Sequence, residues 1–388
     1  MSSESREKSW QEFRGLMPVA ERWAYLDHAA VAPIPRPTAE EVHKWAEQAT
    51  YDGELACPEW YEKVDEVHSL TARMIGSHPE EVALVSNTSH GINIVAFGLD
   101  WRAGDNVVFP GHEFPTNQYP WMALRDLGVE ARRVMPRPDK PLLDVLREAC
   151  DHRTKLIAIS WVQYLDGYRI DLDQACELAH QFGALLCLDA IQGLGVFPID
   201  VGRTPVDFLA ADGHKWLLGP EGAGVLFVRR EHLDRLRPIG VGWHSVVHAR
   251  DFSRIELQLK PSAARFEGGT HNVVGAIGLR ASLEILLQFG ADRISRRILS
   301  LTDYACEKLA ELGAVIVSDR SESAKSGIVA FELPEIDPAF VRKKCLEAGV
   351  VLSVRGGKIR ISPHAYNNED DIDRLTEVIR YCQQSVPA

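Results

Sequence analysis

Several features that mark particular classes of protein are missing from this sequence of 388 residues. Its seven cysteines are scattered, odd in number and include no Cys-x-x-Cys pair, which argues against a disulfide framework and a structural zinc site. No apolar run approaches the roughly 18 residues that span a bilayer. The first residues also lack the apolar segment of a secretory signal. We therefore expect a cytoplasmic protein without a membrane partner.

Positive charge is also scarce, because 43 lysines and arginines face 55 aspartates and glutamates and leave a net charge of -12. This balance argues against nucleic acid as a partner, although it permits a local basic pocket for a phosphate group. Two enzyme motifs are missing as well. No Gly-x-Gly-x-x-Gly follows an early strand, as in dinucleotide-binding enzymes, and no Gly-x-Ser-x-Gly is present, as in many hydrolases.

Short apolar runs alternate with amphipathic stretches between about residues 60 and 290. The runs are rich in β-branched residues and predict buried strands at 82–85, 106–109, 156–162, 185–190, 208–211 and 225–228. Helical patterns lie between them, at 59–75, 91–98, 116–127 and 172–182. This alternation predicts an α/β fold with a mostly parallel sheet.

After about residue 290 the pattern changes to a compact mixture of helices and short strands. Helices are predicted at 294–312, at 338–348 and from residue 369, and strands at 315–317, 328–331, 350–354 and 359–361. Because the chain exceeds the usual size of one domain, we expect more than one. Residues 26–290 would form the large domain and 291–388 a small α+β domain, with 1–25 as an N-terminal segment packing on the small one.

Four polar segments lie at or after predicted strands, where open α/β sheets place their ligands. Asp189 lies at the end of the strand at 185–190. A carboxylate there is equally suited to capping a helix and to pairing with a protonated pyridine nitrogen, which keeps the ring an electron sink. Lys215 follows the strand at 208–211. Such a lysine is usually exposed, but the apolar, glycine-rich residues 216–224 would lower its pKa and favour the neutral amine that forms imines.

The other two segments open helices. Residues 86–93 place Thr88 and Ser89 at a helix start, where hydroxyls cap the helix and the free N–H groups also suit a phosphate. Residues 265–272 form a glycine-rich turn with Thr270 as a cap before a predicted helix at 273–289. Each segment is a weak signal by itself. For residues 86–93, a helix cap alone and a helix cap that also binds phosphate both stay open.

Taken together, the segments resemble the class V aminotransferase superfamily of enzymes that use pyridoxal 5'-phosphate (PLP). The joint match consists of Asp-x-x-Gln, Gly-His-Lys and Phe-Glu-x-Gly-Thr, and the resemblance extends from Tyr25 to Arg360. It implies a fold type I enzyme with a seven-stranded-type sheet in its large PLP-binding domain. The superfamily includes cysteine desulfurases, selenocysteine lyases, kynureninase, isopenicillin N epimerase and several transaminases.

The resemblance implies which residues hold the cofactor ring. Lys215 matches the Schiff-base lysine, which also moves protons at the substrate Cα. Asp189 matches the partner of the pyridine nitrogen, and Gln192 the glutamine near the phenolic oxygen. Phe114 falls where relatives stack a ring on the cofactor, and because stacking needs only a π face, phenylalanine suits that place. Phe114 is also compatible with an ordinary core position.

The phosphate and the substrate have their own implied residues. Ser89, with Thr88 beside it, and His214 match the groups that hold the phosphate. Thr270 matches a threonine that completes the neighbouring subunit's phosphate site, which implies a homodimer. Arg360 matches the arginine that binds the substrate carboxylate. Arg355 is a second candidate, which is also compatible with a surface position. His28 and Ala29, in an N-terminal loop, are expected to line the substrate pocket. No metal is expected.

The sequence departs from its relatives at three places. The small-domain loop that carries the nucleophilic cysteine of desulfurases is missing, and no cysteine lies between Cys345 and Cys382. Asp212 replaces a serine that touches the phosphate in some relatives, and its role is left open. Gln163 and Tyr164 stand where desulfurases have an asparagine near the ring, and their contact with the cofactor is left open too.

The resemblance implies chemistry at Cα of an amino acid, through an external aldimine with the cofactor. An aminotransferase of class V type is the leading interpretation. Two alternatives are compatible with the missing cysteine: a cysteine-independent C–S lyase that works by β-elimination, and an amino-acid epimerase. The missing cysteine disfavours a cysteine desulfurase. The substrate side chain and the metabolic pathway are not predicted.

Overall fold

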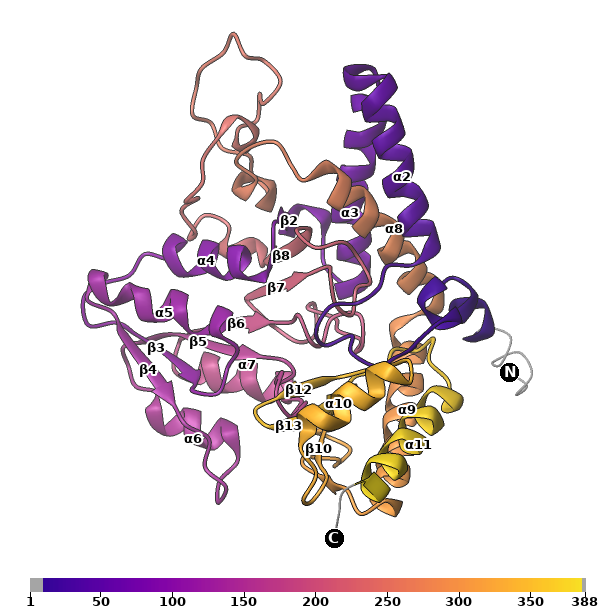
Figure 1. Cartoon of the computed structure of the whole chain (residues 1–388). Coiled ribbons are helices and arrows are strands. Elements are labelled where there is room, and N and C mark those ends of the chain that lie inside the picture. Colours follow the sequence, from indigo (N-terminus) through magenta and orange to yellow (C-terminus); the bar gives the residue numbers. More distant parts are fainter. Residues whose placement is uncertain (1–9, 386–388) are drawn as a thin grey trace.

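The computed structural model describes residues 10–385, which are built around one seven-stranded sheet (Figure 1). Its strand order is β2-β8-β7-β6-β5-β3-β4. The bounds are β2 (Val82–Val85), β3 (Asn106–Pro110), β4 (Glu130–Val134), β5 (Thr154–Ser160), β6 (Leu185–Asp189), β7 (Phe208–Asp212) and β8 (Gly224–Val228). β8 runs antiparallel to β7 and β2, and the other neighbouring pairs are parallel. The expected α/β fold with a mostly parallel sheet is confirmed.

Successive residues of the strand β2 enter two different cores. Val82 and Leu84 belong to the core on one face of the sheet, whereas Ala83 and Val85 belong to the core on the other. Because side chains alternate between faces, a strand covered on both sides needs apolar residues at every position. The edge strand β4 was not predicted, since its arginines stay partly exposed and no apolar run marks it.

Helices cover both faces of the sheet. The bounds are α2 (Arg36–Tyr51), α3 (Cys57–Ile75), α4 (Thr88–Gly98), α5 (Tyr119–Ala123), α6 (Leu142–Ala149), α7 (Leu172–Gln181) and α8 (Val273–Phe289). Apolar side chains of α3, α6, α7 and α8 enter one core, and those of α4 and α5 enter the other. The predicted helix at 116–127 is divided into α5 and two short 3-10 turns, because Pro115 and Pro120 donate no hydrogen bond.

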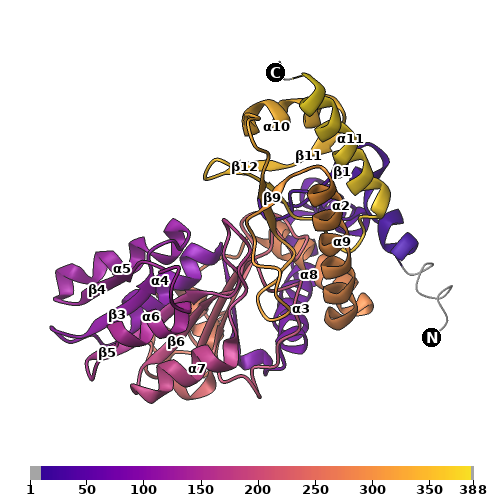
Figure 2. The ribbon, with the colours of Figure 1, turned by 90° about the horizontal axis from the view of Figure 1, so that it is seen from below.

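The C-terminal part has a four-stranded sheet of its own, in the order β12-β13-β10-β9. Its elements are α9 (Ala291–Glu311), β9 (Val315–Ile316), β10 (Val329–Glu332), α10 (Pro338–Glu347), β12 (Ser353–Arg355), β13 (Lys358–Ile361) and α11 (Glu369–Ser385). This unit lies beside the large sheet (Figure 2). The predicted strand at 350–354 is divided, because β11 (Val350–Val351) pairs instead with the N-terminal β1 (Ala24–Tyr25).

The N-terminal segment contacts both parts of the chain. The ring of Phe13 stacks on Phe289 at the end of α8, with 4.5 Å between the ring centroids. Arg14 makes an ion pair of 2.8 Å with Asp371 of α11. The expectation for residues 1–25 falls partly on residues 1–9, which lie outside the described chain, and the division at about residue 290 stays a prediction.

Between residues 10 and 385, no single helix has the length and apolar character needed to cross a membrane. Only α8 and α9 taken together reach that length and composition, with a bend of 82° between them. The chain turns at Gly290, whose φ of 80° favours glycine.

Candidate active site

A cavity of about 280 Å³ lies beyond the carboxyl ends of β6 and β7, the edge where parallel sheets place their ligands. It is lined by residues that are far apart in the sequence. Those that the sequence had predicted for the site are Thr88, Ser89, Phe114, Asp189, Gln192, His214, Lys215, Arg355 and Arg360. The cavity therefore brings together most of the predicted site, and only Thr270 and His28 lie elsewhere.

Lys215 reaches the cavity from the turn that follows β7. The turn packs closely, since a Cβ at Gly213 would lie 2.6 Å from the carbonyl oxygen of Ala223. The Nζ of Lys215 lies 5.7 Å from the ring centroid of Phe114. Burial lowers the pKa of Lys215 to about 8, and the carboxylate of Asp189 opposes this shift. A substantial fraction of the amine is therefore neutral and nucleophilic near neutral pH.

Asp189 is a buried carboxylate without a cationic partner. Its Oδ1 accepts a hydrogen bond of 3.1 Å from the N–H of Ile191. Within residues 10–385, no lysine, arginine or histidine nitrogen makes an ion pair with it. Burial raises the pKa of Asp189 to about 6, against the effects of the Ile191 N–H and the charge of Lys215. An unpaired buried carboxylate is costly, and a protonated ring nitrogen would compensate it.

The carboxamide of Gln192 is held in one orientation. Its Nε2 donates to the carbonyl oxygen of Ala29 at 3.0 Å, and its Oε1 accepts a hydrogen bond of 2.7 Å from the indole N–H of Trp216. These two bonds tie the end of β6 to the N-terminal loop and to the residue after Lys215. The side chain lines the cavity in a fixed position.

The N-terminus of α4 presents hydroxyls and free N–H groups to the cavity. Asn87 caps the helix by accepting a hydrogen bond of 2.8 Å from the N–H of His90. The hydroxyls of Ser89 and Thr116 lie 2.8 Å apart. The positive end of the helix dipole lies at this place and suits an anion such as a phosphate. Thr116 was missed by the sequence analysis, although it follows Phe114 by only two residues.

The structure shows where the carboxylate of Asp212 points. Its Oδ2 lies 2.9 Å from Nδ1 of His214, and its Oδ1 accepts a hydrogen bond of 2.7 Å from the N–H of Gly213. The hydroxyl of Thr88 accepts a hydrogen bond of 3.0 Å from the N–H of Asp212. The negative charge is therefore directed at a histidine and at its own turn, which reduces its repulsion of an anion in the cavity.

Arg360 projects into the cavity from β13 and is almost fully buried. One NH2 group donates to the carbonyl oxygen of Tyr164 at 2.6 Å, and the other donates to Asp27 Oδ1 at 3.3 Å. Ser353 also donates to Asp27 Oδ1, at 2.9 Å. Asp27 was not predicted as part of the site, because it is more than 300 residues away in the sequence. Arg355 lines the same cavity from an exposed position at the end of β12.

Tyr164 and Gln163, whose contacts the sequence left open, point in different directions. Tyr164 lines the cavity, and its ring packs edge-to-face on Phe114 with 5.1 Å between the centroids. Gln163 turns away and donates to Glu113 Oε1 at 2.8 Å. Phe114 therefore lies at the cavity wall and not in a core.

His28 does not line the cavity, contrary to expectation. Its ring is fully buried, with Nδ1 2.9 Å from the carbonyl oxygen of Ser362 and Nε2 2.9 Å from the hydroxyl of Tyr366. Burial lowers the pKa of His28 to about 4. The backbone turns after His28, so that the next residue, Ala29, lines the cavity instead.

Thr270 is exposed and lines a separate cavity of about 170 Å³, together with residues 266–272. It does not contribute to the cavity of Lys215 within the same chain. Its predicted role, in the site of a second subunit, stays a prediction.

Glu113 is a fully buried carboxyl group behind the cavity wall. Its Oε1 accepts hydrogen bonds from the N–H of Ser160 and from Gln163, both at 2.8 Å, and its Oε2 accepts one from the Ser160 hydroxyl. Burial raises the pKa of Glu113 from its ordinary 4.5 to about 7, against the Ser160 bonds and with the help of the charge on Asp189. Near neutral pH this group is about half protonated.

We expect Glu113→Gln to stabilise the enzyme at pH 8 and to leave its stability unchanged near pH 4. The folded protein holds the Glu113 proton more tightly than the unfolded chain, so its free energy of unfolding falls as pH rises from about 4.5 to about 7. Glutamine carries no charge and removes this loss, which amounts to at most about 3 kcal/mol. Urea unfolding at both pH values measures the difference. Equal stabilities of the two proteins at pH 8 would contradict the prediction.

The comparisons with known proteins agree with this fold. A probable cysteine desulfurase of Methanothermobacter thermautotrophicus is 29% identical over 95% of this chain and 97% of its own. The isopenicillin N epimerase of Streptomyces clavuligerus is 28% identical over the same shares. The cystine C–S lyase C-DES, solved with glycine covalently linked to its PLP cofactor, has a TM-score of 0.88 at 21% identity, covering 94% of this chain and 98% of that one.

The fold and the cavity define an enzyme that works with pyridoxal 5'-phosphate. The hydroxyl-lined end of the cavity, at the N-terminus of α4, suits the phosphate, and the unpaired carboxylate of Asp189 suits the ring nitrogen. The family model "Aminotransferase class-V" matches residues 24–375, so the chain belongs to the class-V aminotransferase family.

Proposed function

We propose that this enzyme is an aminotransferase that acts at Cα of an amino acid. The observation that carries the proposal is the cavity itself, which gathers a buried lysine, the unpaired carboxylate of Asp189 and two arginines. PLP, when bound, supplies the electron sink that stabilises negative charge at Cα. Lys215 takes the proton from Cα, and its lowered pKa suits a base that works near neutral pH.

The positions of the cysteines favour a reaction that does not use a thiol group. None of the seven lines the cavity of Lys215. Cys345, the candidate nearest in sequence to the small-domain loop of desulfurases, is buried in α10, and burial raises its pKa to about 12. A thiol of this kind is a poor nucleophile at neutral pH. Persulfide formation by a desulfurase is therefore disfavoured, although relatives carry that name.

The alternative is a cysteine-independent C–S lyase or an amino-acid epimerase. Lys215 would remove the Cα proton in all three reactions, and bound PLP would supply the electron sink. The reactions would differ in the next step: Lys215 would deliver the proton to the cofactor for transamination, a second proton donor on the opposite face of Cα would be needed for epimerisation, and a β-substituent would leave for elimination. The similarity to isopenicillin N epimerase keeps the second outcome open.

The experiment that decides is an amino-acid panel given to the purified holoenzyme, in the presence of several 2-keto acids. Three products are followed in parallel: a new keto acid without sulfide, the opposite enantiomer, and sulfide or another β-product. Keto acid formation that depends on an added amino acceptor is the result we expect. Racemisation or β-product release without such an acceptor would overturn the aminotransferase in favour of the alternative.

We assign the substrate carboxylate to Arg360, with Arg355 as a second contact. The Nε of Arg360 is buried and has no hydrogen-bond partner in the described chain, while its two NH2 groups are held by Tyr164 and Asp27. These contacts position a guanidinium at the cavity wall before substrate arrives. Planar, bidentate geometry makes arginine the residue best suited to a carboxylate.

We expect Arg360→Lys to raise KM for the amino acid about 10-fold to 100-fold. Lysine keeps the charge but loses the paired geometry, and a hydrogen bond to a charged group contributes about 1.5–3 kcal/mol. The matched control is Arg342→Lys on the surface of α10. Steady-state kinetics measure both variants, and thermal unfolding checks that Arg360→Lys remains folded. An unchanged KM in the folded variant would remove Arg360 from the substrate site.

We further propose a homodimer in which Thr270 completes the phosphate site of the second subunit. Its exposure and its separation from the cavity of Lys215 support this arrangement. The scattered cysteines support a cytoplasmic location.

A further inference from the structure

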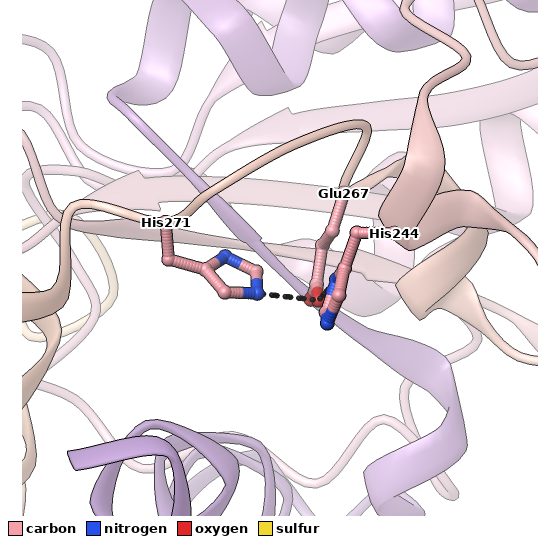
Figure 3. A group of neighbouring side chains, drawn as sticks. All are labelled: His244, Glu267 and His271. Atoms are coloured by element: carbon pink, nitrogen blue, oxygen red, sulfur yellow. Dashed lines mark ion pairs between the residues drawn. The ribbon is translucent and has the colours of Figure 1, made fainter. Parts of the chain in front are cut away.

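Three potential metal ligands converge at a place that the proposed reaction does not use. His244 lies in a short 3-10 turn (Trp243–Ser245), Glu267 follows another (Ala263–Phe266), and His271 precedes α8. One ligand atom from each lies within 4.8 Å of the others. Figure 3 shows the ring of His271 directed at the carboxylate of Glu267, with the ring of His244 beside that carboxylate. None of the three residues lines the cavity of Lys215.

The carboxylate of Glu267 is held so that one oxygen faces the two imidazoles. Its Oε1 accepts a hydrogen bond of 2.8 Å from the N–H of Leu84 and contacts Nε2 of His68 at 2.7 Å. Its Oε2 lies 3.4 Å from Nε2 of His271 and 3.8 Å from Nδ1 of His244. The Glu267 side chain is 1% exposed. A buried carboxylate oriented by a histidine and an amide is typical of a metal ligand, because its outer contacts fix its direction.

The imidazole of His244 has a ring nitrogen without a partner. Nδ1 of His244 is buried and has no hydrogen-bond partner in the described chain. The rings of His244 and His271 lie edge to face, with 4.7 Å between their centroids. A metal ion bound at this place would satisfy the buried nitrogen, which is otherwise costly to bury.

A second group of similar composition differs in one decisive respect. His180 and His232 lie 3.0 and 2.6 Å from the two oxygens of Asp207, and the N–H of Leu186 donates to one of these oxygens at 2.7 Å. Both oxygens of Asp207 are thus already engaged by hydrogen bonds. A metal ion would have to break those bonds, whereas Oε2 of Glu267 meets the two imidazoles only at the longer distances of 3.4 and 3.8 Å.

We propose that His244, Glu267 and His271 bind a divalent transition-metal ion, for which zinc is the best match. Two imidazoles and one carboxylate are a common zinc ligand set that leaves a fourth position open. Zinc bonds of about 2.0–2.1 Å in a tetrahedral site place ligand atoms about 3.3 Å apart. The separations of 3.4 and 3.8 Å require shifts of only a few tenths of an ångström.

Such an ion would strengthen the connection between two turns that are already joined by a hydrogen bond of 3.3 Å from the N–H of His244 to the carbonyl oxygen of Gly268. It would connect the turn that carries His244 to the turn that opens α8. The second turn also carries Thr270, which lines the separate cavity of about 170 Å³ together with His271. The metal would therefore hold the loop of Thr270 in place without taking part in chemistry at Lys215.

The test is metal binding by the holoenzyme after treatment with a chelator. Isothermal titration with Zn²⁺ is expected to give one ion per chain, and Co²⁺ is expected to give the visible absorption of a four-coordinate site. His244→Gln and His271→Gln should each weaken Zn²⁺ binding at least about 100-fold, because each removes a direct ligand. The PLP absorbance of each variant checks that the fold is intact.

The matched control is His180→Gln, which removes a partly exposed histidine from the group around Asp207. It should bind Zn²⁺ as tightly as the unchanged enzyme. Stoichiometric binding that persists in both His244→Gln and His271→Gln, or that is lost in His180→Gln, would overturn the proposal. So would a titration of the unchanged holoenzyme that detects no binding. These outcomes do not depend on which amino acid the enzyme uses.

Discussion

Lys215→Ala is expected to lower turnover at least about 1,000-fold, because a positioned acid–base group contributes about 100-fold to 10,000-fold and this lysine also binds the cofactor. The variant should also lose the near-visible absorbance that the PLP enzyme shows when the lysine holds its cofactor. The lysine lies in a buried cavity with a pKa of about 8, and no other lysine lines that cavity. No second lysine amine is therefore available in the cavity to form the imine.

Two measurements separate this loss from misfolding. Lys308→Ala, on the exposed side of α9, serves as the matched control and should retain full activity and absorbance. A small primary amine added to Lys215→Ala should restore part of the turnover, because it supplies the missing base in solution. If Lys215→Ala kept both its absorbance band and turnover within about 10-fold of the unchanged enzyme, Lys215 would not be the reacting residue.

Asp189→Asn is expected to have opposite effects on activity and on the stability of the cofactor-free enzyme. Asparagine cannot carry the negative charge that keeps the ring nitrogen protonated, so turnover should fall about 100-fold or more, as for loss of a group that stabilises developing charge. Its volume and shape are nearly those of aspartate. Effects of packing are therefore small compared with the effect of charge.

The stability effect follows from the burial of Asp189. Its pKa is raised from an ordinary 3.8 to about 6, so the free energy of unfolding of the cofactor-free enzyme falls as pH rises through this interval. Above pH 6 the buried charge costs roughly 3 kcal/mol, at about 1.4 kcal/mol per pKa unit. Asparagine avoids most of this cost, and urea unfolding at pH 7.5 should show a more stable variant.

The same substitution should give no such gain when the cofactor is bound, because the charge of Asp189 is then compensated. The control is Asp173→Asn, at the exposed start of α7. An Asp189→Asn variant that is less stable than the unchanged protein in its cofactor-free form would contradict the account of an unpaired buried carboxylate.

The regular elements were predicted best where burial is uniform. β2 has the predicted bounds, 82–85, and α8 the predicted bounds, 273–289, because every position of the strand and most of the helix is apolar. β4 and α2 were missed. β4 is an edge strand with exposed arginines, and among the residues of α2 only Thr38 is buried. Elements that bury little leave a weak pattern in the sequence.

The sequence by itself determined which chemical groups stand at the strand ends. Lys215, Asp189 and the start of α4 lie at or just after predicted strands, and the ends of parallel strands meet at one edge of the sheet. Each segment was a weak signal by itself, and the resemblance to the class V family implied that they hold one cofactor. The lack of a cysteine in the small-domain loop is a property of the sequence too.

Only the tertiary structure decided how distant residues meet. Asp27 pairs with Arg360 across 333 positions, and His28 turns into the core while the next residue faces the cavity. The cluster around Glu267 likewise joins a turn near residue 244 to the start of α8. Such contacts depend on how the two sheets and their loops pack against each other. Neither the hydrophobic periodicity nor the spacing of motifs in the sequence predicts that packing.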